Sequence, residues 1–276
     1  MRRTDGVGAP VDAALAYDEY AHRYDDLLTE NHINAYMRQE MTRTLLSTFG
    51  PGNQLIELGS GTGDEAISLA RAGCNVVAVD PSQQMVQLAT RKAAAEGLGN
   101  RLEFLVASAV DAAHLLGERG TSPRFDGAYA SFSLSYEPNL SKVAEALAPL
   151  IVKNGLFVIA HMNRLCGVEL MAAVLWGRPS LAGRRIGIRT LHKVGERVTL
   201  IFPRTASEIL RAFRPYFALD RLRALPAVLP PHYANRSLGK LPGLLELLLE
   251  ADSGISRLPL IRGMGDQNLL CLRRIG

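Results

Sequence analysis

Hydrophobic and polar positions alternate along residues 53–160 as short apolar runs followed by longer stretches with helical spacing. This order is typical of a parallel β-sheet whose strands are joined by crossover helices. The apolar runs predict strands at Gln54–Leu58, Asn75–Val79, Leu102–Val106, Gly127–Ser131 and Leu156–Ala160. The stretches between them predict helices near Asp64–Ala72, Ser82–Glu96, Asp111–Leu116 and Leu140–Leu150, the last of which ends at Lys153-Asn154-Gly155.

The flanking regions add elements on both sides of this core. Before it, Ala14–Phe49 is tyrosine-rich and has apolar positions at helical spacing, so helices are expected there. After it, the pattern predicts a helix at Leu165–Trp176, a strand at Arg197–Phe202, a capping box at Thr205–Glu208 that opens a helix to Phe213, and strands at Phe217–Ala224 and Asn268–Leu272. Residues 226–265 hold several prolines and a leucine-rich helix around Leu244–Leu249, which together form an insertion.

Composition excludes several classes of protein. The 276 residues are 47% hydrophobic and 21% charged, which is enough for a full core and incompatible with a disordered or fibrous chain. The three cysteines form no CxxC pair, so neither a disulfide framework nor a metal site is expected. The most apolar stretch contains Glu169 and is shorter than the roughly 20 residues of a membrane span. The start lacks a secretory signal, so we expect a soluble cytoplasmic protein without a membrane span.

Charge is divided unevenly along the chain. The net charge is −7 over residues 1–150, +7 over residues 151–220 and +4 over residues 221–276. The basic excess includes Arg178, Arg184, Arg185, Arg189 and Lys193. This run is either a solvated face or a surface that receives an acidic or amphipathic acceptor. Since no aromatic residues are interleaved with these cations, nucleic acid is not the expected partner.

The segment most informative about chemistry runs from Leu55 to Asp64, where an apolar strand leads into a Gly-x-Gly-x-Gly turn that opens a helix. Glycines allow the backbone to approach a ligand, and a helix N-terminus offers free N–H groups to an anion. Asp64 stands where a dinucleotide-binding motif has its third glycine, which disfavours NAD. Asp80, 19 residues after Gly61 at the end of the second strand, is placed to accept hydrogen bonds from ribose hydroxyls.

These residues resemble those of the class I S-adenosylmethionine-dependent methyltransferases, small-molecule branch. Glu57–Gly63 resembles the first motif of that family, Asp80 its ribose-binding acid, and Phe125–Tyr129 its fourth-strand motif. The segment Tyr17–Asp25 is similar to its N-terminal tyrosine-rich helix. The resemblance covers residues 14–160. It implies an α/β, Rossmann-like, doubly wound and mostly parallel seven-stranded sheet, with N-terminal helices and a helical insertion or lid in the C-terminal half.

The resemblance also implies an organisation and a cofactor, S-adenosyl-L-methionine. Residues 1–52 would lie over the cofactor site, 53–160 would form the cofactor-binding core, and 161–276 would add the substrate side within the same domain. The glycine loop would hold the methionine part, Asp80 the ribose and Met85 the adenine. The cofactor-binding residues so implied are Tyr24, Arg38, Glu57, Gly59, Ser60, Gly61, Asp80, Pro81, Met85, Ser108, Ala109, Ser131, Phe132 and Ser133.

Two of these positions leave questions open. Ser108 stands where the family has an acid that binds the adenine amino group, so adenine recognition could rest on the Ala109 backbone or on Asp111. Arg38 could pair with the cofactor carboxylate, and a surface arginine is the alternative.

The expected reaction is methyl transfer to O, N or C of a small, apolar or amphipathic metabolite. Ser131-Phe132-Ser133-Leu134 stands where methyltransferases of nucleobases and glutamine resemble one another in an Asn/Asp-Pro-Pro motif, which disfavours those acceptors. His161, at the end of the fifth strand, is the candidate general base, and a structural strand-end histidine is the alternative. An apolar acceptor pocket is expected from Leu165–Trp176 and the Leu241–Leu249 insertion.

Alternatives to this function remain open at the level of the sequence. The chain could bind S-adenosylmethionine without transferring methyl, as a regulatory or partner subunit, or use the sulfonium electrostatically in another reaction. The oligomeric state is undetermined, and a homodimer is one of the open states.

Overall fold

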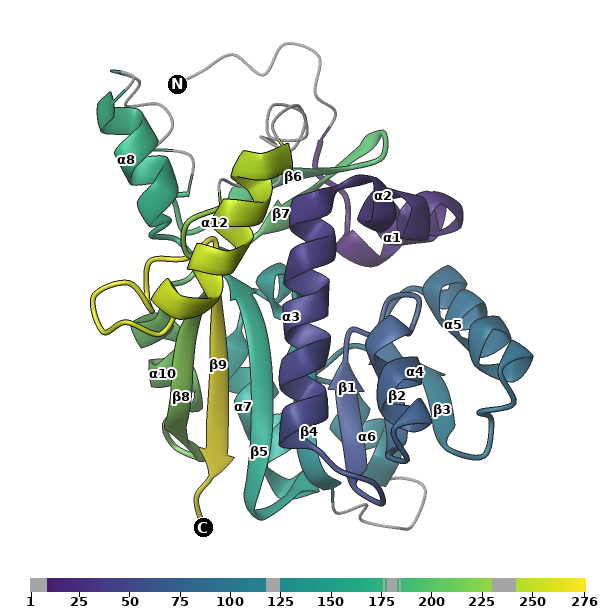
Figure 1. The fold of residues 1–276 in the computed structure, drawn as a ribbon. Helices are drawn as coiled ribbons and strands as arrows, with labels where there is room; N and C mark the ends of the chain where they lie inside the picture. The colour runs from purple at the N-terminus through teal and green to yellow at the C-terminus, as the bar shows by residue number, and fades with distance from the viewer. Residues whose placement is uncertain (1–8, 118–124, 176, 178–182, 184, 230–241) are drawn as a thin grey trace.

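The apolar runs of the sequence form the strands of one seven-stranded sheet (Figure 1). The computed structural model describes residues 9–117, 125–175, 177, 183, 185–229 and 242–276. The strands are β1 (Gln54–Leu58), β2 (Asn75–Asp80), β3 (Leu102–Val106), β4 (Phe125–Ser131), β5 (Ile151–Met162), β8 (Phe217–Leu225) and β9 (Gln267–Arg274). Their order across the sheet is β3-β2-β1-β4-β5-β9-β8.

The sheet is mostly parallel, as predicted. β1 to β5 are paired in parallel, and β9 is antiparallel to its neighbours β5 and β8. Because the carboxyl ends of parallel strands meet at one edge, the turns that follow β1, β2 and β4 are brought together there. The expected α/β class and Rossmann-like sheet are therefore confirmed.

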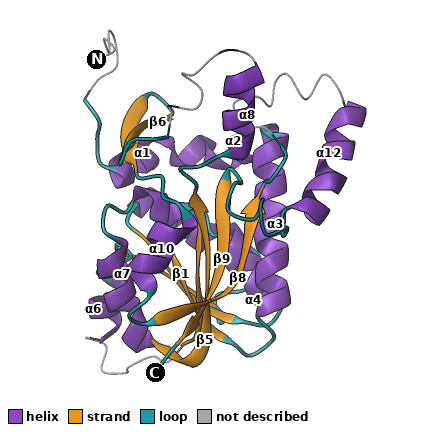
Figure 2. Cartoon of the chain, turned by 90° about the vertical axis from the view of Figure 1, so that its left-hand side faces the viewer, coloured by secondary structure: helices purple, strands orange, loops and turns teal. Residues whose placement is uncertain are grey.

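Helices cover both faces of the sheet. Figure 2 shows the sheet between α6, α7 and α10 on one side and α3 and α4 on the other. The bounds of these helices are α3 His32–Thr48, α4 Asp64–Arg71, α6 Ala112–Gly117, α7 Leu140–Leu147 and α10 Ala206–Phe213, and α5 (Gln83–Ala95) packs beside β3 and β2. The alternation of strand and helix in the sequence thus becomes two apolar cores, one on each face of the sheet.

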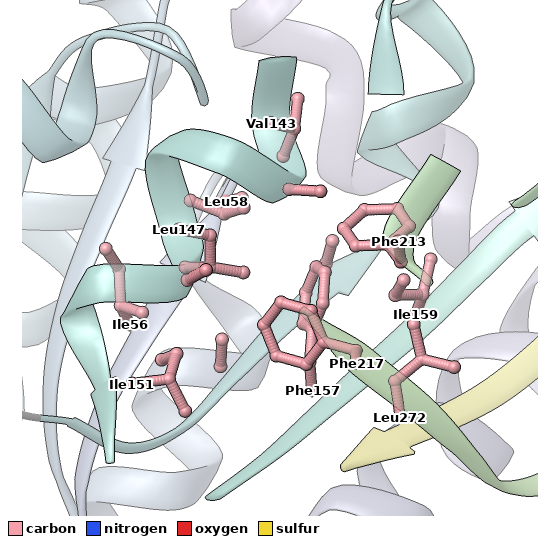
Figure 3. Packing of buried hydrophobic residues seen from close by; sticks show 14 of the residues in the cluster. Ile56, Leu58, Val143, Leu147, Ile151, Phe157, Ile159, Phe213, Phe217 and Leu272 are labelled. Atoms are coloured by element: carbon pink, nitrogen blue, oxygen red, sulfur yellow. The ribbon is translucent and has the colours of Figure 1, made fainter. Parts of the chain in front are cut away.

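Three phenylalanines join elements that are far apart in the sequence. Phe157 on β5, Phe213 on α10 and Phe217 on β8 contact one another with ring centroids 5.4–6.0 Å apart (Figure 3). All three are buried. α10 is held in position at its start by the predicted capping box, in which Thr205 and Glu208 bond each other's backbone amides. This cluster attaches the C-terminal strands to the predicted core.

The N-terminal segment lies over the carboxyl edge of the sheet. It contains α1 (Ala13–Tyr20), a short 3₁₀ turn at Ala21–Arg23 and α2 (Tyr24–Glu30), followed by the long α3. Beside it, β6 (Thr190–Val194) and β7 (Arg197–Ile201) pair antiparallel in a small second sheet. The Val11 amide bonds the Val198 carbonyl at 2.8 Å, so the chain before α1 is fixed to this hairpin.

Two predictions of local structure were wrong. β5 begins at Ile151, so Lys153-Asn154-Gly155 lies within the strand rather than ending a helix. Asn154 has a φ of 67°, and the pairing of β4 with β5 shifts between Phe125 and Gly127, so the expected turn is a strand irregularity. β6 was also missed, because an arginine-rich stretch with exposed alternate residues carries a weak apolar signal.

Two further helices of the described residues are α8 (Gly167–Leu175) and α12 (Pro242–Ile255). Within the described ranges, no helix combines the length and the apolar character needed to cross a bilayer. Cys74, Cys166 and Cys271 are all buried and carry free thiols.

Replacing Phe213 by alanine should destabilise the fold by about 3–5 kcal/mol, because it removes a buried ring and leaves a cavity. Urea unfolding monitored by circular dichroism measures this loss. Arg211→Ala on the exposed side of α10 is the matched control and should change the free energy of unfolding by less than about 0.5 kcal/mol. An equal effect of both substitutions would contradict the role of the phenylalanine cluster.

Candidate functional site

A pocket of about 320 Å³ lies at the carboxyl edge of the sheet, where the turns after β1, β2 and β4 meet beneath the N-terminal helices. Every residue predicted to bind the cofactor lines this pocket, with the exception of Glu57. Further residues at the wall were not predicted, and they are Asp12, Ala13, Ala14, Tyr17, Leu58, Leu134, Tyr136, Glu137 and Pro138. The sequence thus located one end of the pocket and missed most of the other.

The glycine turn after β1 is held by backbone hydrogen bonds to β2. The amides of Gly59 and Ser60 donate to the Val79 carbonyl at 2.7 and 3.0 Å. Gly59 has a φ of 77°, and a Cβ there would lie 2.2 Å from the Cβ of Ser133. A side chain at this position is therefore excluded both by backbone conformation and by the contact with the turn after β4.

Asp80 connects the glycine turn to the end of β2. Its Oδ2 accepts from the Gly61 amide at 2.8 Å, and its Oδ1 accepts from the Ser82 amide at 2.9 Å. The side chain is buried at the pocket wall. Burial raises the pKa of Asp80 to about 6, although the hydrogen bonds from the Ser82 and Gly61 amides oppose this rise. Each oxygen retains a lone pair for a hydroxyl donor in the pocket.

Arg38 is a half-buried member of the site whose guanidinium is paired within the protein. Its Nη1 bonds both oxygens of Glu65, at 2.8 and 2.7 Å, and its Nη2 donates to the Tyr24 hydroxyl at 2.6 Å. The guanidinium also lies 5.7 Å from the Tyr24 ring and 5.8 Å from the Phe132 ring. Much of its hydrogen-bonding capacity is thus used within the protein, which leaves a smaller role toward a ligand carboxylate than the sequence indicated.

Two hydroxyl groups at the pocket wall make no hydrogen bond with the described residues. Ser60 and Ser131 are buried, and in the part of the chain that the structure describes their Oγ atoms have no hydrogen-bond partner. Phe132, which follows Ser131, has a φ of 64°, an unusual conformation for a phenylalanine. Such strain and such orphaned hydroxyls are typical of ligand sites. The residues present therefore fit a polar ligand that lies along the glycine turn.

The end of the pocket predicted to hold adenine is formed by Met85, Ser108 and Ala109. Met85 is buried in the first turn of α5, which Ser82 caps. The Ser108 hydroxyl donates to Asp111 at 2.6 Å and accepts from the Asp111 amide at 3.1 Å. Asp111 therefore acts on the pocket only through Ser108, because its own side chain does not line the wall.

The N-terminal helices are tied over the pocket by polar contacts. Asp18 of α1 accepts from the Ser82 hydroxyl at 2.6 Å, and Glu19 forms a two-point ion pair with Arg197 of β7 at 2.7 Å. Tyr17 and Tyr136 share a hydrogen bond of 2.6 Å between their hydroxyls. Burial raises the pKa of both phenols, so they remain protonated and can donate. Tyr17 belongs to a motif that the sequence analysis identified. No pattern in the sequence indicated its contact with Tyr136, which is 119 residues later.

His161 does not reach the pocket. It is buried, its Nδ1–H donates to the Met162 carbonyl at 2.9 Å, and its Nε2 lies 3.2 Å from Nη1 of Arg204. Burial lowers the pKa of His161 to about 4. Arg204 in turn donates to the carbonyls of Glu137 and Pro138, both at 2.8 Å. The geometry thus gives the histidine a structural place behind the pocket wall and not the position expected of a base.

Glu57 also lies behind the wall. It is fully buried on β1 and accepts from the Tyr129 hydroxyl at 3.2 Å, while its Oε1 has no partner among the described residues. Burial, together with the nearby charge of Glu65, raises the pKa of Glu57 well above its usual range. Its contribution to ligand binding would be indirect, through the electrostatics beneath the glycine turn.

The end of the pocket opposite the predicted cofactor residues is formed by residues other than those predicted to bind the acceptor. Among the side chains that the structure describes, none from α8 or α12 lines the pocket, whose second end takes its residues from the ranges 12–17 and 134–138. Trp176 and Leu241 of the predicted acceptor pocket lie outside the described residues. Within the basic run, Arg178 and Arg184 lie outside the described residues. Arg185 is buried and paired with Asp266 at 2.5 Å and with Glu169 at 3.0 Å, so this member is not part of a solvated face. Among the described residues, no group of three or more His, Cys, Asp or Glu is arranged to hold a metal ion.

Comparisons with known proteins identify a methyltransferase-like segment in this chain. Residues 55–155 match a family model described as a methyltransferase domain. Over 143 residues, the chain is 32% identical to the demethylmenaquinone methyltransferase of Beutenbergia cavernae, a segment that makes up 51% of this chain and 51% of that enzyme. The chain thus spans about half the length of that relative.

Solved structures are similar in fold. A 1,6-didemethyltoxoflavin-N1-methyltransferase of Burkholderia thailandensis, with S-adenosylhomocysteine bound, aligns over 98% of this chain and 94% of that one, with a TM-score of 0.54 and 17% identity. A geranyl diphosphate methyltransferase aligns over 86% of this chain and 77% of that one, with a TM-score of 0.55 and 17% identity. The resemblance to class I S-adenosylmethionine-dependent methyltransferases is confirmed for the fold and for residues 55–155.

Asp80 should make stability depend on pH. Its folded pKa of about 6 exceeds the ordinary value of 3.8, so the folded state binds the proton more tightly than the unfolded state. The resulting stabilisation is present below about pH 4 and is lost as pH rises through about 6, a change of about 3 kcal/mol. Relative to the wild type, Asp80→Asn should therefore gain about 3 kcal/mol in urea unfolding between pH 4 and pH 7. A difference that stays constant over this range would contradict the burial of the charge.

Proposed function

We propose that this chain transfers a methyl group from S-adenosylmethionine to a small, apolar or amphipathic acceptor. The premise is its fold and its 55–155 segment, which resemble those of class I methyltransferases. The observation that supports this most is the coincidence of the pocket with the predicted cofactor residues, from the glycine turn to Ser133. A chance surface hollow would not collect residues from the ends of β1, β2, β3 and β4.

The cofactor would be held by groups that the fold leaves ready for it. Asp80 would accept from the ribose hydroxyls, Met85 would pack on adenine, and the free hydroxyls of Ser60 and Ser131 would bond polar groups of the ligand. Bound S-adenosylmethionine supplies a methyl group on a cationic sulfonium. Toward this cation the protein contributes the buried carboxyl group of Asp80, which lines the pocket.

The acceptor would bind at the second end of the pocket. Ala13, Leu134 and Pro138 give this end an apolar surface, and the paired hydroxyls of Tyr17 and Tyr136 add a donor that can orient an oxygen or nitrogen of the acceptor. Both phenols stay protonated because burial raises their pKa values, so they position the acceptor and do not remove its proton. The acceptors named for two similar proteins, demethylmenaquinone and geranyl diphosphate, are apolar or amphipathic.

A proton acceptor, where the substrate needs one, is available in Glu137. Its side chain lines the pocket beside Tyr136, and its Oε1 accepts from the Asn139 amide at 2.9 Å, which leaves Oε2 unbonded among the described residues. Arg204, backed by His161, fixes the Glu137 backbone. His161 would therefore act through Arg204 as a positioning residue, and Glu137 replaces it as the candidate base.

The wider setting is part of the same proposal. The partner would be a small molecule and not nucleic acid, and the protein would work in the cytoplasm. Binding of S-adenosylmethionine without methyl transfer is the weaker alternative, because the matched family model and the similar proteins are described as methyltransferases.

Calorimetry with S-adenosylhomocysteine should show binding that weakens at least about tenfold in Asp80→Ala, because the variant loses a buried acceptor for ribose hydroxyls. Wild-type affinity should also fall as pH drops below about 6, where the carboxylate becomes protonated and loses a lone pair for the hydroxyls. Glu145→Ala, on the exposed side of α7, is the control and should bind as the wild type does. Unchanged affinity in Asp80→Ala refutes the ribose assignment.

Acceptor preference can be measured with labelled S-adenosylmethionine and two probes, a short-chain demethylmenaquinone and the polar 1,6-didemethyltoxoflavin. Label should enter the lipophilic probe, and transfer to the polar probe alone would contradict an apolar acceptor end.

Glu137→Gln should lower kcat by about 10²-fold if the acceptor must lose a proton, with S-adenosylhomocysteine affinity retained. Glu145→Gln serves as the matched control. A Glu137→Gln variant with full kcat would remove Glu137 as base.

A further inference from the structure

Most of the exposed large apolar side chains that the structure describes lie in three short segments of the C-terminal half. Sixteen large hydrophobic residues are exposed among those the structure describes. Ten of them lie in the segments 165–175, 186–191 and 258–264, and we call these three segments the apolar tip. They are Leu165, Met171, Val174, Leu175, Ile186, Ile188, Leu191, Leu258, Leu260 and Met264. Val174, Leu175 and Leu260 are 81%, 79% and 87% exposed, values that a core-facing side chain never has.

Buried contacts fasten the three segments to one another. Arg185, immediately before Ile186, bonds Glu169 of α8 at 3.0 Å and Asp266 at 2.5 Å. The Gly167 amide donates to the Met264 carbonyl at 2.7 Å. Figure 1 shows α8 standing away from the sheet, with the yellow segment before β9 on the same side of the molecule. The exposure of the tip is therefore a property of an anchored structure.

The charges of this region have one sign at the surface. Within the described stretches 163–175, 185–194 and 256–266, the only carboxylates are Glu169 and Asp266, and both are buried against Arg185. Four exposed cations accompany the apolar side chains, and they are Arg189, Lys193, Arg257 and Arg262. Arg257 and Arg262 also line a groove of about 380 Å³ together with Arg221, Arg223 and Asp220, whose carboxylate pairs with Arg221 and Arg273. The tip and its flanking residues thus combine exposed aliphatic side chains with exposed cations.

We propose that the apolar tip attaches this protein to the surface of an anionic phospholipid bilayer. Aliphatic side chains that enter the acyl boundary, bordered by Arg and Lys that meet lipid phosphates, are the combination that holds a protein in the plane of a membrane. The tip contains no exposed carboxylate that an anionic surface would repel. In the groove, Arg257 and Arg262 give phosphate headgroups a further binding surface, whereas Arg221 and Arg223 are paired with Asp220 and Glu40.

A second copy of the chain is a poorer occupant of the tip. In a two-fold dimer the same patch meets itself, so a surface that carries Arg189, Arg257 and Arg262 would meet a second surface of the same charge. An anionic bilayer neutralises these charges instead. The attachment would also bring the pocket to the phase in which lipophilic acceptors dissolve. Only this last consequence rests on the proposed function, since vesicle binding requires no methyl transfer.

Co-sedimentation with large unilamellar vesicles tests the attachment directly. The full chain is mixed with vesicles of phosphatidylglycerol and phosphatidylcholine, and separately with vesicles of phosphatidylcholine alone. We expect the partition coefficient to be at least about tenfold higher for the anionic vesicles at about 0.1 M salt, and to fall when the salt is raised. Met171→Ser/Val174→Ser/Leu175→Ser and, separately, Arg257→Gln/Arg262→Gln should each lower it at least about tenfold.

Matched variants keep the result interpretable. Leu46→Ser/Leu219→Ser changes exposed apolar residues outside the tip, and Arg211→Gln/Arg214→Gln changes exposed cations on and after α10; both should bind vesicles as the wild type does. Because the substituted tip side chains are exposed, circular dichroism and S-adenosylhomocysteine affinity should be unchanged. No binding by the wild type, or equal binding by the tip variants, overturns the proposal. Sedimentation that shows a dimer which the serine variant abolishes overturns it in favour of a second copy.

Discussion

The hydrogen bond from the Gly61 amide to the Asp80 carboxylate is the constraint on which the pocket depends. A glycine turn at the start of a helix leaves amides without intrahelical partners, and a free carboxylate beside it would be costly to bury. Each group satisfies the other. The bond fixes the turn after β1 to the end of β2, and it holds Asp80 at the wall while lone pairs remain for a ligand.

The other walls of the pocket are built outward from this bond. Gly59 lies so close to Ser133 that the turn after β1 sets the position of the turn after β4. That second turn carries Ser131 and Phe132, and it continues to Tyr136 and Glu137 at the acceptor end. Arg204, with His161 behind it, holds this continuation from below, and α1 covers it from above. Cofactor and acceptor ends are therefore mechanically continuous although they come from separate parts of the chain.

The sequence predicted what depends on local spacing and missed what depends on distant pairing. Gly59, Gly61 and Asp80 could be located because strand, turn and helix follow one another within a short segment. The partnership of Arg38 with Glu65 was not predictable, since α3 and α4 meet only in the folded chain. His161 lies at the expected strand end, but its ring contacts Arg204, which is 43 residues later in the sequence. Because of this contact, the candidate base is a structural residue. Long-range packing, which no periodicity encodes, decided these cases.

The cover over the pocket has a kinetic consequence. α1 is attached through the Asp18 bond to Ser82 and through the ion pair of Glu19 with Arg197, whose side chains are 44% and 48% exposed. Ions in solution screen an exposed pair, whereas they hardly affect the buried bond between Gly61 and Asp80. Raising the ionic strength thus loosens the cover while the floor of the pocket keeps its shape. The residence time of a bound ligand therefore depends on the salt concentration through the cover. The shape of the pocket floor, which recognises the ligand, does not depend on it.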